Sequence, residues 1–147
     1  MKTLLCAPLL FICGIAIAQE GDSAKDLEAM QGTWLVASLV EIGKALPAAE
    51  LAVLEVTIEK DTFTVKEKGE VAVQYQIKLD PEKTPKAIDF THLIGENKGK
   101  TEPGIYTFDK GQLKLCLDET RKGRPTVFEG KETEKFSVIT LKKKDAE

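Results

Sequence analysis

Catalysis or metal binding in this chain would have to use very few residues. His92 is the only histidine among the 147 residues, and its nearest acidic neighbour is Asp89. On an extended strand, positions three apart point to opposite faces, so Asp89 and His92 are not expected to chelate one ion together. After residue 18 the sequence has no Cys-x-x-Cys, His-x-x-x-His or Asp-x-Asp spacing. We therefore predict no metal site and no cofactor.

The other motifs that could carry chemistry each lack a necessary part. No Gly-x-Ser-x-Gly sequence exposes a nucleophile, and Ser38 and Ser137 lie inside expected strands. In residues 95–101, GENKGKT, three residues separate the two glycines, whereas a phosphate-binding loop has four and is followed by a helix. Carboxylates are abundant, but whether two of them pair as acid and base depends on tertiary structure. We predict that the protein is not an enzyme and that its carboxylates lie on loops and outer strand faces.

The first 18 residues have the pattern of a secretory signal peptide. Met1 and Lys2 form a short positive region, residues 4–18 are uncharged and mostly apolar, and Ala16 and Ala18 are the small residues that precede a cleavage site. The apolar run is shorter than the roughly 20 residues that span a bilayer. A retained anchor helix is the alternative. We expect export to the periplasm, cell envelope or medium, with no membrane span after cleavage.

Removal of this leader leaves one mildly acidic domain, residues 19–147. The chain has 21 Lys plus Arg and 24 Asp plus Glu, and the leader contains one Lys and no acid, so the mature charge is −4. This balance argues against nucleic-acid binding. Cys6 and Cys13 leave with the leader, so Cys116 has no cysteine to pair with in the mature chain and is expected to be packed. The fold must therefore depend on its apolar core.

Hydrophobic alternation predicts an all-β fold. From Val71 to Leu79, apolar residues alternate with Ala, Gln and Lys, which is typical of a strand with one buried face. Shorter alternations, separated by turn signals, occur at Val56 and Ile58, Phe63 and Val65, Tyr106 and Phe108, Leu113, Leu115 and Leu117, and Phe136 and Val138. About eight or nine antiparallel strands can hide their edges in a closed barrel or a strongly curved sandwich, and the short hairpin spacing favours an up-and-down barrel.

Two short segments are expected to be helical. Residues 23–26, SAKD, fit a capping box in front of Leu27 and Met30. Pro47 suits the first position of a second short helix, which would follow the first strand. Neither helix is long enough to form a core by itself.

The triplet Gly32-Thr33-Trp34 follows the first expected helix directly. This order resembles barrels of the lipocalin type, in which a Gly-x-Trp motif starts the first strand and the Trp closes one end of the barrel. In those barrels an Arg of the last strand lies over the Trp. This chain offers only Lys142 to Lys144 at that place.

A longer series of motifs resembles a narrower group. The stretches MQGTW, GKALPAAELAVLEVTIEKDTFTV, KLDPEKTPKAIDF, GKTEPGIYTFDKGQLKLC and GRPTVF occur in this order. They resemble the uncharacterised lipocalin-like domain family of exported planctomycete proteins, over nearly all of the mature chain. The resemblance implies an antiparallel lipocalin-like barrel. It implies no catalytic or ligand residues, because that family has no established activity to transfer.

Two functions remain open at this point. The first is a non-catalytic binder that holds a small apolar or amphipathic ligand inside the barrel, with candidate binding residues Trp34, Tyr75, Phe90, Tyr106, Phe108 and Leu115. The second is a structural or protein-interaction module of the cell envelope whose interior is packed shut. An empty interior pocket of at least about 300 Å³ would favour the binder.

We predict that the mature N-terminus is Gln19, because Ala16 and Ala18 form the small-x-small signal that the peptidase requires. The intact mass of the exported protein checks this directly. A mass that still contains residues 1–18 would mean that the segment is an anchor.

Overall fold

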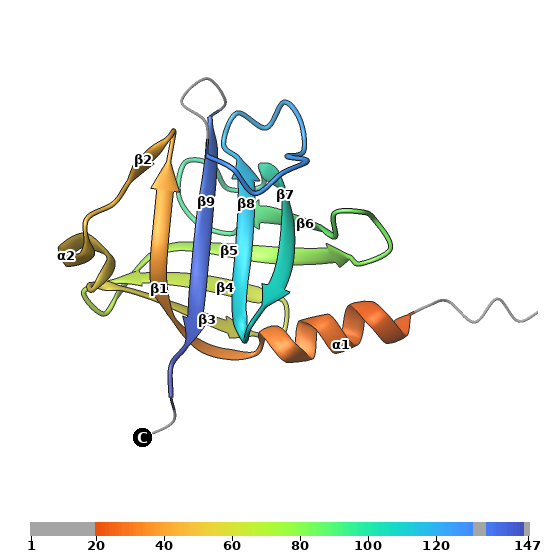
Figure 1. Cartoon of the computed structure of the whole chain (residues 1–147), viewed down its shortest axis with the longest axis horizontal. Coiled ribbons are helices and arrows are strands. Elements are labelled where there is room, and N and C mark those ends of the chain that lie inside the picture. Colours follow the sequence, from red (N-terminus) through yellow and green to blue (C-terminus); the bar gives the residue numbers. More distant parts are fainter. Residues whose placement is uncertain (1–19, 131–134, 146–147) are drawn as a thin grey trace, which may run out of the picture.

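Nine strands and two helices follow one another in residues 20–130 and 135–145, which are the residues that the computed structural model describes. Figure 1 shows their arrangement. The elements are α1 (Glu20–Met30), β1 (Gly32–Glu41), β2 (Lys44–Ala45), α2 (Ala48–Leu51), β3 (Leu54–Glu59), β4 (Thr62–Glu67), β5 (Glu70–Asp80), β6 (Ala87–His92), β7 (Thr101–Asp109), β8 (Gln112–Asp118) and β9 (Phe136–Lys143).

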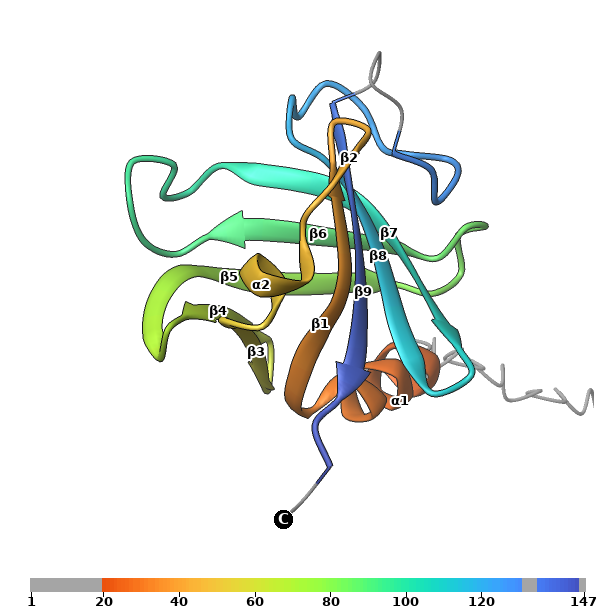
Figure 2. The same ribbon diagram turned by 60° about the vertical axis from the view of Figure 1, so that its left-hand side comes forward.

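The sheet closes into a barrel of eight antiparallel strands. Strands β3 to β9 pair with their sequence neighbours, while β1 pairs with β3 along one edge and with β9 along the other (Figure 2). The two-residue strand β2 extends the sheet only beside the end of β1. Because β1 and β9 pair, the barrel has no long open edge. The predicted lipocalin-like barrel is confirmed, and the sandwich alternative is wrong.

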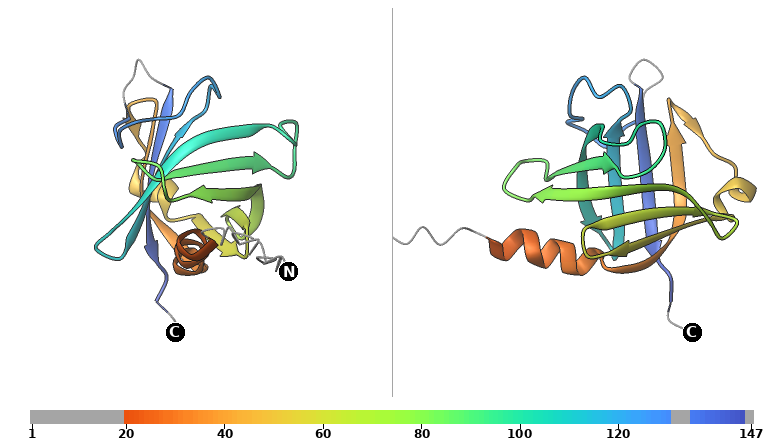
Figure 3. Two further views of the ribbon diagram at one scale, coloured as in Figure 1. Left: turned by 90° about the vertical axis from the view of Figure 1, so that its right-hand side faces the viewer. Right: turned by 180° about the vertical axis from the view of Figure 1, so that it is seen from behind.

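One end of the barrel is closed by α1 and by the start of β1 (Figure 3). Trp34 is only 2% exposed, and its indole N–H donates a hydrogen bond of 2.8 Å to the carbonyl of Met30. The ammonium of Lys143 lies 4.8 Å from the centroid of the Trp34 ring, at the place where a lipocalin-type barrel carries an Arg. Asp26 of α1 accepts hydrogen bonds of 2.7 Å from both Tyr106 and Lys86. These contacts hold the helix against the barrel.

Both helices differ from their predicted starts. Helix α1 begins at Glu20, so Ser23 lies within the helix and does not cap it. The capping-box pattern identified a possible cap, but the helix continues upstream through Gly21 and Asp22, and an acidic side chain in a first turn is favourable. Pro47 has an extended backbone and precedes α2 as its cap residue. The second helix is therefore a single turn.

The segment after β8 covers part of the outer barrel wall. Cys116 points outward from β8, yet it is 0% exposed because Phe128 and Phe136 pack over it together with Val138. This burial agrees with the packing role predicted for the thiol. Val138 thus belongs to a small outer cluster, so the alternation at Phe136 and Val138 marked a strand correctly but not its inner face.

Arg124 ties this covering segment to β6 and β7. Its guanidinium donates to the carbonyls of Ile88 and Gly104 at 3.0 and 2.7 Å, and to the carboxylate of Asp89 at 2.7 Å. Gly104 is required here, because a β-carbon at that position would lie 2.8 Å from the carbonyl oxygen of Cys116. The strands on either side of Gly104 therefore approach too closely for any side chain.

Trp34→Ala should lower the free energy of unfolding by about 3 to 5 kcal/mol, because it removes a buried large aromatic ring and leaves a cavity. The same change also removes the hydrogen bond to Met30 and the ring beneath Lys143. Urea titration of both proteins measures the difference. A loss below about 1 kcal/mol would contradict the role of Trp34 in closing the barrel.

Candidate functional site

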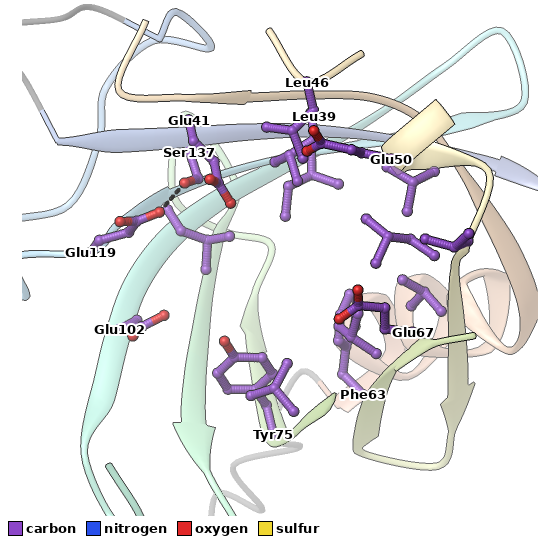
Figure 4. Close-up of a pocket in the computed structure, with 18 of the residues that line it drawn as sticks. Leu39, Glu41, Leu46, Glu50, Phe63, Glu67, Tyr75, Glu102, Glu119 and Ser137 are labelled. Carbon is purple, nitrogen blue, oxygen red and sulfur yellow. Dashed lines mark hydrogen bonds between the residues drawn. The ribbon is translucent and has the colours of Figure 1, made fainter. Parts of the chain in front are cut away.

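A cavity of about 610 Å³ lies inside the barrel (Figure 4). On β1 its lining begins at Val36 and ends at Glu41, so it occupies the half of the barrel away from Trp34 and α1. Its walls come from the ends of several strands and from the segment around α2. The apolar side chains that line it are Val36, Leu39, Leu46, Ala49, Val53, Leu54, Val56, Phe63, Val65, Val73, Tyr75, Leu117 and Ile139. The cavity is open to solvent on one side.

Side-chain size explains why this half stays open while the other half is filled. The closed half contains Trp34, Met30 and Tyr106, which are large and fully buried. Several wall positions of the cavity carry valine, which is too short to reach across a barrel. Between the two halves lies an aromatic cluster in which Phe63, Tyr75 and Phe90 make edge-to-face contacts with centroids 5.2 to 6.3 Å apart. This cluster forms the cavity floor.

Carboxylates surround the cavity. Of the described residues that line it, five are acidic and one, Lys68, is basic. Figure 4 shows Glu41, Glu102 and Glu119 beside Ser137 on one side of the cavity, with Glu50 of α2 and Glu67 of β4 farther along it; the five are Glu41, Glu50, Glu67, Glu102 and Glu119. The prediction that carboxylates lie on loops and outer strand faces is wrong for Glu102, which is buried on the inner face of β7. The other four are exposed and lie at strand ends, in α2 or in the turn after β8.

Glu102 is the most deeply placed of the five and is already paired. Its carboxylate lies 2.8 Å from Nε2 of His92 and 3.4 Å from the guanidinium of Arg121. The side chains of His92 and Glu102 are only 8% and 11% exposed. The ring of Tyr75 lies 4.6 Å from the imidazole. His92 therefore has a hydrogen-bond partner inside the barrel, while Asp89 points to the outside, as their spacing predicted.

The carboxylates nearer the mouth repel one another. Partial burial, followed by the charges of Glu119 and Glu50, raises the pKa of Glu41 above its usual range. Glu119 accepts a hydrogen bond from the hydroxyl of Ser137. The carboxylates of Glu41, Glu50 and Glu67 make no hydrogen bond or ion pair with another described residue. Three negative groups at the mouth thus lack a compensating partner in the described chain.

Tyr75 presents a phenol to this cavity. Burial, and then the charge of Glu102, raises the pKa of its hydroxyl far above the usual value. The hydroxyl stays protonated at neutral pH, and it makes no hydrogen bond to another described residue. It is therefore available as a donor or an acceptor.

The structure separates the six residues predicted to bind a ligand. Tyr75 lines the cavity, and Phe90 lies directly beneath it against Tyr75. The other four lie outside the cavity: Trp34, Tyr106 and Leu115 are buried in the filled half, and Phe108 packs against that core. Their large side chains fill the barrel, so they leave no space beside them. Whether any of the six binds a ligand stays a prediction.

Sequence reasoning missed the acidic lining, although one signal was present. Glu102, Tyr106 and Phe108 share one face of β7, because their positions differ by even numbers. An acid on the inner face of a strand was therefore visible in the sequence. Glu41 and Glu119 stand at strand ends, where alternation gives no such information.

Ser137 donates its hydrogen bond to Glu119, and His92 contacts Glu102. No three His, Cys, Asp or Glu side chains in residues 20–130 and 135–145 come close enough to hold a metal ion. Within the same ranges, no helix is long and apolar enough to cross a bilayer.

No family model, curated protein or solved structure that was compared with the chain matches it. The resemblance to the planctomycete lipocalin-like family therefore stays a prediction.

Asp118 holds the segment that carries Glu119 and Arg121, and we predict that Asp118→Asn destabilises the protein at neutral pH. Asp118 is 4% exposed and accepts hydrogen bonds from the backbone N–H groups of Thr120, Lys122 and Gly123 and from the Thr120 hydroxyl. Burial alone would raise its pKa, but these hydrogen bonds outweigh burial and lower the pKa below its ordinary value.

A lowered pKa in the folded state means that the ionised carboxylate stabilises the fold above its unfolded pKa, and that this contribution is lost as pH falls through the folded pKa. Asp118→Asn should therefore cost about 1 to 3 kcal/mol at pH 7 and less at pH 3, which lies below the unfolded pKa. Urea titrations at both pH values measure this. Asp109→Asn, at the exposed last position of β7, is the charge-matched control. An equal loss at both pH values would contradict the charged hydrogen bonds.

Proposed function

We propose that the mature domain is an exported, non-catalytic binding protein that holds one small amphipathic molecule in the open half of its barrel. The observation that carries this proposal is the cavity of about 610 Å³. Its volume falls within the range of about 300 to 1,000 Å³ that is typical of small-molecule sites. Export rests on the leader pattern in residues 1–18, which lies outside the described residues.

The composition of the cavity wall supports this function. Thirteen of its lining side chains are apolar or aromatic, and the other seven are polar or charged, with all of them except the deeper Glu102 nearer the mouth. Such a wall favours burial of an apolar group, at roughly 25 cal/mol for each Å² removed from water. The polar groups can orient whatever part of the ligand stays near solvent.

The alternative is a structural or protein-interaction module with a filled core. Packing of Met30, Trp34 and Tyr106 in the closed half supports this alternative for that half alone. A module without a ligand would have no need of an open half lined by short side chains. Filling that half would add buried contacts and stability. We therefore favour the binder.

A neutral solvatochromic dye tests the proposal. Nile red should bind the mature domain at one saturable site, with a blue shift of its emission, because the cavity removes it from water. Val73→Trp should weaken binding at least tenfold, because the larger ring of a wall residue fills the space. Leu35→Trp adds the same ring to the outer wall, where Leu35 is 42% exposed, and should leave binding unchanged.

Thermal unfolding of each variant, followed by circular dichroism, establishes that both remain folded. Absence of saturable dye binding to the unmodified domain would contradict the proposed function. Equal binding to the Val73→Trp and Leu35→Trp proteins would place the dye elsewhere.

A further inference from the structure

We propose that the ligand of this cavity is an amphipathic organic cation, with an alkyl or aryl body on the cavity floor and an ammonium group among the carboxylates at the mouth. This inference rests on the proposed function, because it names the chemical class of the molecule held at the same site. It follows from three features of the cavity: its apolar depth, the sign of its charges, and the distribution of their partners.

The apolar depth requires an organic ligand. Phe63, Val56 and Val36 are buried side chains that line the inner part of the cavity. They offer no polar atom to a hydrated ion. A bare metal ion would also need several ligand groups close together, and the described residues contain no such group of three. An occupant that uses these walls must therefore carry a hydrocarbon part.

The charges of the lining residues determine which sign of charge the polar part of the ligand carries. Five carboxylates and one ammonium, that of Lys68, line the space. An anionic amphiphile such as a fatty acid would bring a sixth negative group into this surface, and like charges brought together without counter-charges disfavour binding. A cationic group would instead offset the repulsion among Glu41, Glu50 and Glu119, which adds to the effect of burial on the pKa of Glu41.

The distribution of partners places the cation at the mouth. Glu102, the deep carboxylate, already contacts both His92 and Arg121. Glu41 and Glu50 make no hydrogen bond or ion pair with another described residue. Glu41 ends β1 and Glu50 lies in α2, so both stand where the ligand would enter (Figure 4). The ammonium group would therefore stay close to solvent, which limits its desolvation cost.

Three probes of equal chain length separate the charge from the hydrocarbon: octylammonium, octan-1-ol and octanoate, each titrated calorimetrically into the mature domain at pH 7.5. Octylammonium should bind roughly tenfold more tightly than octan-1-ol, and octanoate more weakly than either, given the size of Coulomb energies near a protein surface. Raising NaCl from 50 to 500 mM should weaken octylammonium binding severalfold and leave octan-1-ol unchanged, because salt screens exposed charges.

Charge-neutralising variants locate the effect. The double variant Glu41→Gln/Glu50→Gln should weaken octylammonium binding roughly tenfold and change octan-1-ol binding less than about twofold. Glu28→Gln/Glu82→Gln is the matched control, since it removes the same charge from exposed positions in α1 and in the turn after β5 that do not line the cavity. This control should bind all three probes as the unmodified domain does.

The outcomes distinguish the two levels of the proposal. If octan-1-ol binds and octylammonium binds no more tightly, the inference that the ligand is a cation is wrong, while the proposed binding function stands. Equal losses in the two double variants would show that overall charge, and not the mouth, attracts the probe, and would also overturn the inference. If none of the three probes binds and Nile red does not bind either, the proposed function falls together with the ligand class.

Discussion

Pairing between β1 and β9 is the constraint on which the other features depend. It closes the sheet, and thereby creates an inside and an outside for every strand. The same ladder sets both ends of the barrel. Trp34 pairs with Lys143 at the closed end, which brings the ammonium over the indole, and Glu41 pairs with Ser137 at the open end, which brings the mouth carboxylate beside the hydroxyl that contacts Glu119. A shift of this register by one residue would turn both sets of side chains to the other face.

The two halves of the barrel interior differ in packing, since one is filled and the other contains the cavity. Large side chains fill one half, where Met30, Trp34 and Tyr106 are almost fully buried. Hydrogen bonds from Trp34 and Tyr106 to α1 hold the helix against this half. Short side chains leave the other half open above the aromatic floor of Phe63 and Tyr75. The crowded carboxylates line the open half. The filled half can hold the fold together while the open half keeps groups that do not favour folding, as binding sites commonly do.

The outer wall also contributes to the core, which a simple barrel would not require. Cys116, Ile105 and Val138 face outward and are nevertheless buried under Phe128 and Phe136. Arg124 and Asp118 fasten the covering segment through hydrogen bonds to the backbone. The same segment carries Glu119 and Arg121 to the cavity. Its attachment to the wall therefore sets the position of charged groups at the mouth.

Local patterns in the sequence were sufficient for the elements and the architecture. Alternation of period two at Val71 to Leu79 and at Leu113 to Leu117 predicted strands, because side chains of a strand point to opposite faces in turn. Short turns between such strands predicted an up-and-down barrel. The resemblance of the Gly32-Thr33-Trp34 triplet to lipocalin-type barrels implied that Trp34 closes one end. The predicted starts of the two helices were wrong. The start of α1 differed, since several residues near an N-terminus can begin a helix equally well.

Only the tertiary structure decided where the barrel is hollow and which charges surround the hollow. Alternation cannot distinguish an inner face from a covered outer face, so Val138 and Ser137 could not be assigned. Of the aromatic residues predicted to hold a ligand, Tyr75 lines the cavity, whereas Trp34 and Tyr106 fill the closed half. Glu41 and Glu102 come from β1 and β7, and Glu119 comes from the turn after β8. Their meeting at one rim depends on closure between β1 and β9, a contact between the two ends of the domain that no local pattern encodes.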